Sequence, residues 1–164
     1  IRDRVPNIDA VDAFRAAHGA EWRVVMDARR GVPTLVGGGA IPLLPGPAND
    51  LLWQDFEIGC AALACLSDAT VETAARDLLA AQEDLLGIDV DDLVLDSDGT
   101  LATGRAVYLI RFQYAPSGVP VRKGSVYLRV SAGNLIQLAT ENVASLAVDP
   151  VARGQRVALL YRRR

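Results

Sequence analysis

Two alternating stretches in the second half of the chain constrain its fold more than any other feature. Between Arg105 and Tyr114 every even position is apolar or aromatic, and the polar side chains Arg105, Arg111 and Gln113 all hold odd positions. A period of two is typical of a β-strand that buries one face. Alternation returns after residue 118, but the apolar positions are odd at Val119 and Val121 and even from Val126 onward.

This change of parity predicts a β-bulge at Gly124. A strand that keeps burying one face after such a change must absorb one extra residue, because a slip of one residue would turn its apolar side chains to water. Gly124 stands between the two phases, and glycine accepts dihedral angles that other residues avoid. We therefore expect one bent strand from Val119 to Val130 that curls the sheet.

Two segments have the spacing of helices. Residues 7–18 place Val11 and Phe14 on one face and are followed by Gly19, a typical C-terminal stop. His18, beside that glycine, is expected to have a structural or capping role. The clearest helix is predicted from Thr70 to Leu86, with Gly87 at its end. Its apolar stripe, at spacings of three and four, comprises Val71, Ala74, Ala75, Leu78, Leu79, Leu85 and Leu86.

The remaining segments favour strands and one long loop. Residues 22–26 and 32–36 are predicted to form a hairpin, whereas residues 37–50 contain four glycines and three prolines and predict an extended loop or linker. After the long helix, short strand-like segments alternate with turns, which predicts an antiparallel meander. The expected fold class is α+β: a curved antiparallel sheet packed on one long helix, with an N-terminal helix-hairpin extension.

Composition excludes several classes of partner. The chain has 164 residues, of which 51% are hydrophobic, and a net charge of −3, which argues against nucleic acid as a partner. There is no apolar window of about 18 residues, so no membrane-spanning segment is expected. The charges are segregated, with seven acids and no base in residues 82–104 and five arginines and no acid in residues 151–164. These are either two solvated surfaces or a basic tail that docks on the acidic segment or on a partner.

The residues of catalytic and metal sites are scarce. His18 is the only histidine, and neither HExxH nor GxSxG occurs, so we expect no catalytic residue, no bound metal and no cofactor. Asp96 to Gly99 is similar to the start of a calcium loop, but the rest of that loop is missing, which favours a hairpin turn. Cys60 and Cys65 are expected to be buried thiols, with a local disulfide bridge as the alternative.

Several short motifs together resemble a known family. They are "LLG" at residues 85–87, "RFQY" at 111–114, "GVPV" at 118–121, the glycine before "SVYLRV" at position 124, and "GNL" at 133–135. This set resembles the N-terminal propeptide (FTP) domain of fungalysin- and thermolysin-type metallopeptidases over residues 70–143. Residues 16–38 resemble segments that precede this domain in bacterial secreted proteases. Residues 148–161 resemble the entry to a second propeptide subdomain.

The resemblance implies a cystatin-like fold and a division into residues 1–50, the FTP-like residues 51–145 and a truncated second subdomain from 146 to 164. It implies secretion to an extracellular or periplasmic site, and a role as intramolecular chaperone and inhibitory scaffold. The implied partner is the zinc metallopeptidase domain of the same precursor. Since the part that blocks the active site is expected mainly from the second subdomain, scaffolding is favoured over direct inhibition. The candidate partner-surface residues are Arg111, Gln113, Gly118, Val119, Pro120, Val121, Gly124 and Asn134.

Two other hypotheses remain open at this point. One is a stand-alone or modular secreted domain that binds a protein or a peptide with the same fold. The other is an enzyme with an unrecognised carboxylate site, for which the acidic residues 89–92 are the candidates. The sequence encoded beyond Arg164 would separate them, because a downstream HExxH motif supports the propeptide hypothesis.

Overall fold

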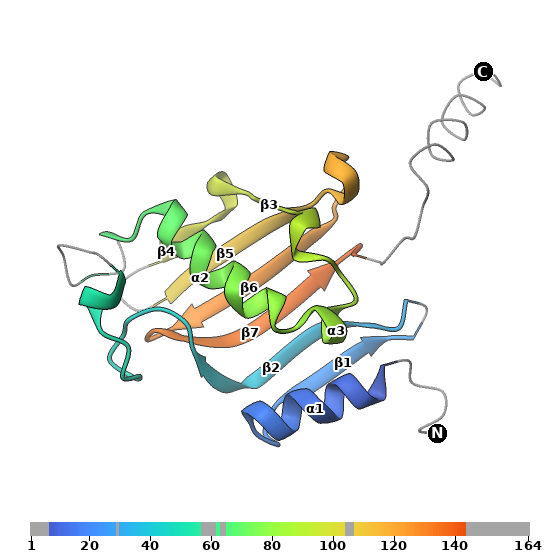
Figure 1. The fold of residues 1–164 in the computed structure, drawn as a ribbon, viewed down its shortest axis with the longest axis horizontal. Coiled ribbons are helices and arrows are strands. Elements are labelled where there is room, and N and C mark those ends of the chain that lie inside the picture. Colours follow the sequence, from blue (N-terminus) through green and yellow to red (C-terminus); the bar gives the residue numbers. More distant parts are fainter. Residues whose placement is uncertain (1–6, 29, 57–61, 63–64, 104–106, 144–164) are drawn as a thin grey trace.

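A computed structural model describes residues 7–28, 30–56, 62, 65–103 and 107–143 and has an α+β fold (Figure 1). Seven strands form one antiparallel sheet in the order β1-β2-β7-β6-β5-β3, with β4 also paired to β5. The helices are α1 (Ile8–His18), α2 (Asp68–Ala80) and α3 (Glu83–Leu86). The strands are β1 (Arg23–Asp27), β2 (Val32–Pro42), β3 (Leu93–Leu95), β4 (Leu101–Thr103), β5 (Val107–Tyr114), β6 (Ser125–Ser131) and β7 (Asn134–Glu141).

The predicted N-terminal hairpin is part of this sheet. β1 and β2 pair as expected, and β2 continues across to pair with β7, the last strand in the chain. Strands β5, β6 and β7 form the predicted meander, joined to β3 and β4 at the far edge. The strands before the boundary expected near residue 50, β1 and β2, therefore belong to the same sheet as the strands after it, β3 to β7. The segment 146–164, expected to begin a second subdomain, lies outside the described residues.

The helix predicted from Thr70 to Leu86 is two helices. α2 begins after Ser67, whose Oγ accepts a hydrogen bond from the N–H of Thr70 at 3.2 Å, and it ends at Ala80. Gln82 leaves the helical conformation, and α3 starts at Glu83. This break allows the neighbours Leu85 and Leu86 both to be buried.

One hydrophobic core joins the helices to the sheet. Figure 1 shows α2 lying across one face of the sheet, which we call the inner face. Val71, Ala75 and Leu79 of α2 belong to the same buried cluster as Ile110, Phe112, Val126, Leu128 and Leu138 of the strands. The guanidinium of Arg76 also lies over the Phe112 ring at 5.4 Å. Val11 and Phe14 of α1 complete this cluster, as their spacing predicted, while His18 packs its ring on Phe14.

The single bent strand predicted from Val119 to Val130 is wrong, because residues 119–124 form a loop and β6 begins at Ser125. The pairing of β5 with β6 runs without interruption from Val107↔Ser131 to Gln113↔Ser125. Beyond it, Tyr114 of β5 bonds to both sides of a turn: its carbonyl oxygen accepts from the N–H of Val121, and its N–H donates to the carbonyl oxygen of Gly124. Val121 packs against the core, so this turn absorbs the change of parity. The N–H of Gly124 donates to the carbonyl oxygen of Val121 at 2.8 Å, which closes a turn at the base of this loop. The positive φ of that turn, 58°, falls on Lys123 and not on glycine.

The sheet does contain register shifts, but elsewhere. The pairing of β2 with β7 shifts between Gly37 and Ile41, and that of β6 with β7 shifts at Arg129 and Val130. Residues 37–42 are therefore strand, and the expectation of a loop from residue 37 is wrong for them. Gly39 is needed there because a Cβ at this position would lie 2.0 Å from Nε1 of Trp22, a buried indole.

The expectation of buried thiols is wrong for Cys65. Cys65 is exposed and disulfide-bonded. Cys60, the only other cysteine of the chain, lies outside the described residues. The alternative expectation was a local disulfide bridge between the two cysteines. The disulfide-bonded state of Cys65 agrees with that alternative.

A thiol count tests this state directly. We expect the purified, unreduced chain to expose no reactive thiol after denaturation in guanidinium chloride, because Cys65 is already oxidised. After reduction the same assay should find two thiols, one for each cysteine of the sequence. Finding two thiols in the unreduced, freshly purified chain would contradict the disulfide.

Candidate functional site

The eight residues proposed from sequence as a partner surface do not form one cluster. Arg111 and Gln113 lie on β5, on the face of the sheet opposite the helices. Gly118, Val119 and Pro120 are exposed in the loop between β5 and β6, whereas Val121 and Gly124 lie at its base, partly or fully buried. Asn134 lies at the opposite end of the meander, where β6 turns into β7.

Gln113 is a structural residue of the β5–β6 loop. Its side-chain Nε2 donates to the carbonyl oxygens of Gly124 at 2.7 Å, Val121 at 2.8 Å and Tyr114 at 3.1 Å. Each of these oxygens also accepts a backbone N–H, from Tyr114, Gly124 and Val121 respectively, so Gln113 adds a second donor to a loop that is already hydrogen-bonded. The Gln113 Nε2 is thus committed to the loop.

Replacing Gln113 by Ala should destabilise the chain by about 0.5–1.5 kcal/mol, the usual net contribution of a hydrogen bond, because the three oxygens lose the side-chain donor but keep their backbone donors. The free energy of unfolding from urea denaturation measures this loss. Ser117→Ala is a matched control in the same loop, because the Ser117 contact with Asp92 uses the backbone N–H and survives the change. Equal stability of Gln113→Ala and the parent chain would show that the amide contacts contribute nothing.

Asn134 has a similar structural role at the other end. It is 7% exposed, its Nδ2 donates to the carbonyl oxygen of Ala48 at 2.9 Å, and its Oδ1 accepts from Nδ2 of Asn49 at 3.1 Å. These bonds fasten the segment after β2 to the β6–β7 turn. Of the eight predicted residues, Gly118, Val119 and Pro120 are exposed and Arg111 is partly exposed, so these four remain accessible to a partner.

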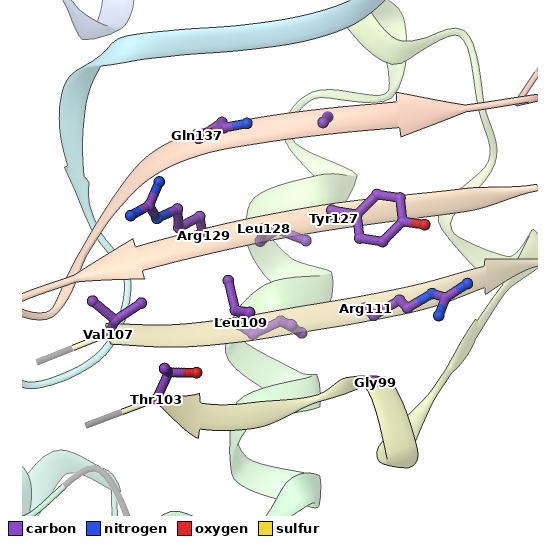
Figure 2. A pocket seen from close by; sticks show the side chains of 11 residues that line it. Gly99, Thr103, Val107, Leu109, Arg111, Tyr127, Leu128, Arg129 and Gln137 are labelled. Atoms are coloured by element: carbon purple, nitrogen blue, oxygen red, sulfur yellow. The ribbon is translucent and has the colours of Figure 1, made fainter. Parts of the chain in front are cut away.

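The more extensive candidate site is the face of the sheet opposite the helices, which we call the outer face. The strand registers place its residues in rows across the sheet. One row runs through Val25, Leu35, Ala139, Tyr127 and Arg111. The next row runs through Arg23, Gly37, Gln137, Arg129, Leu109 and Leu101. Figure 2 shows Leu109, Arg111, Tyr127, Arg129 and Gln137 projecting from this face, with α2 behind the sheet.

Apolar side chains gather on the outer face. Seven large apolar side chains are exposed among the described residues, and five of them lie here. They are Val25, Leu35, Val94, Leu101 and Leu109. Val25 and Leu35 form one group on β1 and β2, and Val94, Leu101 and Leu109 lie on β3 to β5. Exposed apolar patches of this kind mark binding surfaces. No helix among the described residues covers this face (Figure 1).

The outer face is hollowed in two adjoining places. One hollow of about 620 Å³ lies over β4 to β7 and is lined by Leu109, Tyr127, Arg129 and their neighbours. Another of about 880 Å³ lies over β1, β2 and β7, where Gly37 and Gly38 leave space. Gln137 lines both, so the two hollows form one shallow, concave surface.

The charges of the outer face are of two kinds. Arg111 is neutralised within the chain: its Nε lies 3.3 Å from Oδ2 of Asp96, and its guanidinium stacks over the Tyr127 ring at 5.3 Å. Arg23 and Arg129 are exposed, and no carboxylate among the described residues lies within ion-pair distance of either. The outer face therefore presents two cations without an ion-pair partner, of which Arg23 shares its hollow with the exposed carboxylate of Glu21.

Sequence reasoning missed this face, although a signal for it exists. Val107 and Leu109 occupy odd positions of β5, the positions assigned to the polar side of the strand. An outward apolar residue in a strand is a departure from strict alternation, and Val25 and Leu35 are two more. Only the strand order shows that these positions lie near one another.

Groups for acid–base or metal chemistry do not gather in the described part of the chain. No three His, Cys, Asp or Glu side chains there are placed to hold a metal ion. The pKa of Tyr108 is raised by burial and, to a smaller extent, by the nearby charge of Asp68. Its phenol faces the core, so this shift favours the neutral form in the folded chain and does not create a base on the outer face.

Asp96 to Gly99 forms a turn, but the expectation of a hairpin is wrong, because β3 before the turn and β4 after it both pair with β5 and not with each other. The Asp96 carboxylate accepts a hydrogen bond from the N–H of Gly99 at 3.1 Å and pairs with Arg111.

None of the described helices is long and apolar enough to pass through a membrane. No family model, no curated protein and no solved structure matches this chain.

Proposed function

We propose that the chain is the N-terminal propeptide domain of a secreted zinc metallopeptidase precursor, and that its outer face binds the peptidase domain. In this role it acts as an intramolecular chaperone and inhibitory scaffold. The observation that carries the proposal is the concave, apolar and cationic outer face, which no described helix covers. A surface of this kind fits a binding function, because it supplies area and anchor residues without catalytic groups.

The arrangement of elements supports the implied cystatin-like fold. α2 precedes the strands β3 to β7 in the chain and lies across the inner face of the meander they form. The motifs of the resemblance have structural roles that suit this fold: Gln113 of "RFQY" holds the β5–β6 loop, and Asn134 of "GNL" fixes the β6–β7 turn. The disulfide at Cys65 suits secretion, because disulfides persist in oxidising compartments.

Two experiments together test the proposal. Sequencing the coding DNA beyond Arg164 should reveal an HExxH motif. The encoded peptidase domain, denatured and then diluted into buffer, should regain more activity when this chain is present. The matched control is the same chain carrying Leu109→Asp, which places a charge on the outer face without touching the core. A precursor without HExxH, or equal recovery with and without the chain, would contradict the proposal.

The chain itself should neither bind zinc tightly nor hydrolyse protein. The reason is the single histidine, His18, since protein zinc sites usually take three or four side-chain ligands. Treat the purified chain with EDTA, add zinc, remove the excess, and measure bound metal and casein cleavage. Stoichiometric zinc together with cleavage would overturn this expectation.

The second candidate is a stand-alone or modular secreted domain that captures peptides. The observation that favours it is the edge strand β1, which pairs only with β2 among the described residues and leaves its other edge open to an added strand. The coding DNA separates the two functions, because a stop codon or another module after Arg164 supports this one.

A further inference from the structure

We infer that the outer face recognises an acidic segment of its partner, and that Arg129 is the residue that receives the partner's carboxylate. This inference rests on the proposed function in placing the partner at the outer face, and it adds the chemistry of that partner. The partner segment carries Asp or Glu side chains flanked by apolar ones.

The position of Arg129 is central. It lies on β6, which has β7 on one side and β5 on the other, and it faces Gln137 and Leu109 across those pairings. Its side chain is exposed and stands at the edge of the 620 Å³ hollow (Figure 2). Arginines and tyrosines at the centre of an apolar surface are the residues that most often dominate binding energy.

The charge of Arg129 is available, unlike that of Arg111. Asp96 already neutralises Arg111, and the Tyr127 hydroxyl lies 3.4 Å from the carboxylate of Glu141, the last residue of β7. No carboxylate of the described residues pairs with Arg129. A planar guanidinium offers a carboxylate two parallel hydrogen bonds, so an acidic side chain is its natural complement.

The neighbours of Arg129 make such a bond stronger than one in open water. Leu109 and Leu101 continue its row on one side, and Gln137 and Gly37 continue it on the other, ending at the second unpaired cation, Arg23. A partner that covers the apolar residues removes water from the ion pair and strengthens it. Arg23 and Arg129 stand three strand spacings apart, about 14 Å, the length of four residues in an extended chain.

The test uses two synthetic peptides and needs no peptidase. One peptide is acetyl-Glu-Leu-Val-Leu-Glu-amide, whose two carboxylates match the spacing of the cations, and the other has Gln in place of both Glu. Each is titrated into the isotopically labelled full chain while backbone amide shifts are recorded by NMR. The variants are Arg129→Glu and Arg129→Gln, and the control is Arg122→Glu, which changes an exposed arginine in the β5–β6 loop.

We expect the Glu peptide to shift amides of β1, β5, β6 and β7 and to bind more weakly as salt is added. The Gln peptide, and the Glu peptide with either Arg129 variant, should bind at least tenfold more weakly, while Arg122→Glu should bind like the parent. Equal binding of the two peptides, unchanged binding by Arg129→Glu, or no binding of the Glu peptide would overturn the inference.

A second arm separates this inference from the proposed function. The refolding assay of the peptidase domain is repeated with Arg129→Glu. If the parent chain assists refolding and Arg129→Glu assists equally well, the inference is overturned while the propeptide function stands. If the parent chain gives no assistance but the Glu peptide still binds through Arg129, the propeptide function fails while the inference stands.

Discussion

Replacing Leu79 by Ala should destabilise the chain by about 2–5 kcal/mol, the usual range for a buried leucine. Leu79 is 1% exposed and belongs to the cluster that joins α2 to the sheet. Removal of its side chain leaves a cavity, because α2 and the strands hold the surrounding side chains in place. The free energy of unfolding, from urea denaturation of both chains, measures the effect.

The neighbouring residue is the matched control. Leu78 is only partly buried and lies beside an open hollow lined by residues of α2 and the loop after β2. Leu78→Ala should therefore cost less than Leu79→Ala, although the sequence stripe alone treated the two positions alike. A larger loss of unfolding free energy for Leu78→Ala than for Leu79→Ala would mean that α2 turns Leu78, and not Leu79, toward the sheet.

Replacing Gly124 by Val should destabilise the chain by about 1–3 kcal/mol, the range for forcing extra atoms into a packed site. A Cβ at position 124 would lie 2.8 Å from the Cβ of Val121 and 3.1 Å from its carbonyl oxygen. Both residues belong to the turn before β6, so neither can move without disturbing the hydrogen bond between them. Urea denaturation again measures the free energy of unfolding.

Lys123→Gly provides the opposite case in the same turn. Lys123 has φ 58°, a left-handed conformation that glycine adopts at less cost than lysine. The stability of this variant should stay equal to that of the parent or rise. If Lys123→Gly were the damaging change and Gly124→Val the harmless one, the left-handed residue of the turn would not be Lys123 and Gly124 would not be packed against Val121.

The sequence predicted those helices and strands whose apolar residues recur at regular spacing. The spacing of Val11 and Phe14 gave α1, the stripe through Val71, Ala75 and Leu79 gave α2, and the alternation to Tyr114 gave β5. The parity change before β6 has two physical solutions, a bulge or a loop, and both are compatible with the same sequence. They differ in whether residues 119–121 pair with a neighbouring strand, and that long-range pairing is not visible in the sequence.

Long-range contacts account for the other errors. Gly39 looks like a loop residue until the indole of Trp22 is placed against it, and β2 extends through the glycines because β7 lies beside it. The candidate site has the same origin. Leu35, Leu109 and Arg129 are far apart in sequence, and each looks unremarkable there. The order β2-β7-β6-β5 gathers them on one face.

Hydroxyl-radical footprinting tests the role of the outer face most directly. The side chains of Leu109 and Tyr127 are labelled in the isolated chain and in the chain bound to its peptidase domain, with mass spectrometry as the readout. Leu52, an exposed side chain outside this face, is the internal control. We expect the labelling of Leu109 and Tyr127 to fall on binding, while the labelling of Leu52 stays the same. Equal labelling of Leu109 and Tyr127 in the free and bound chain would contradict it.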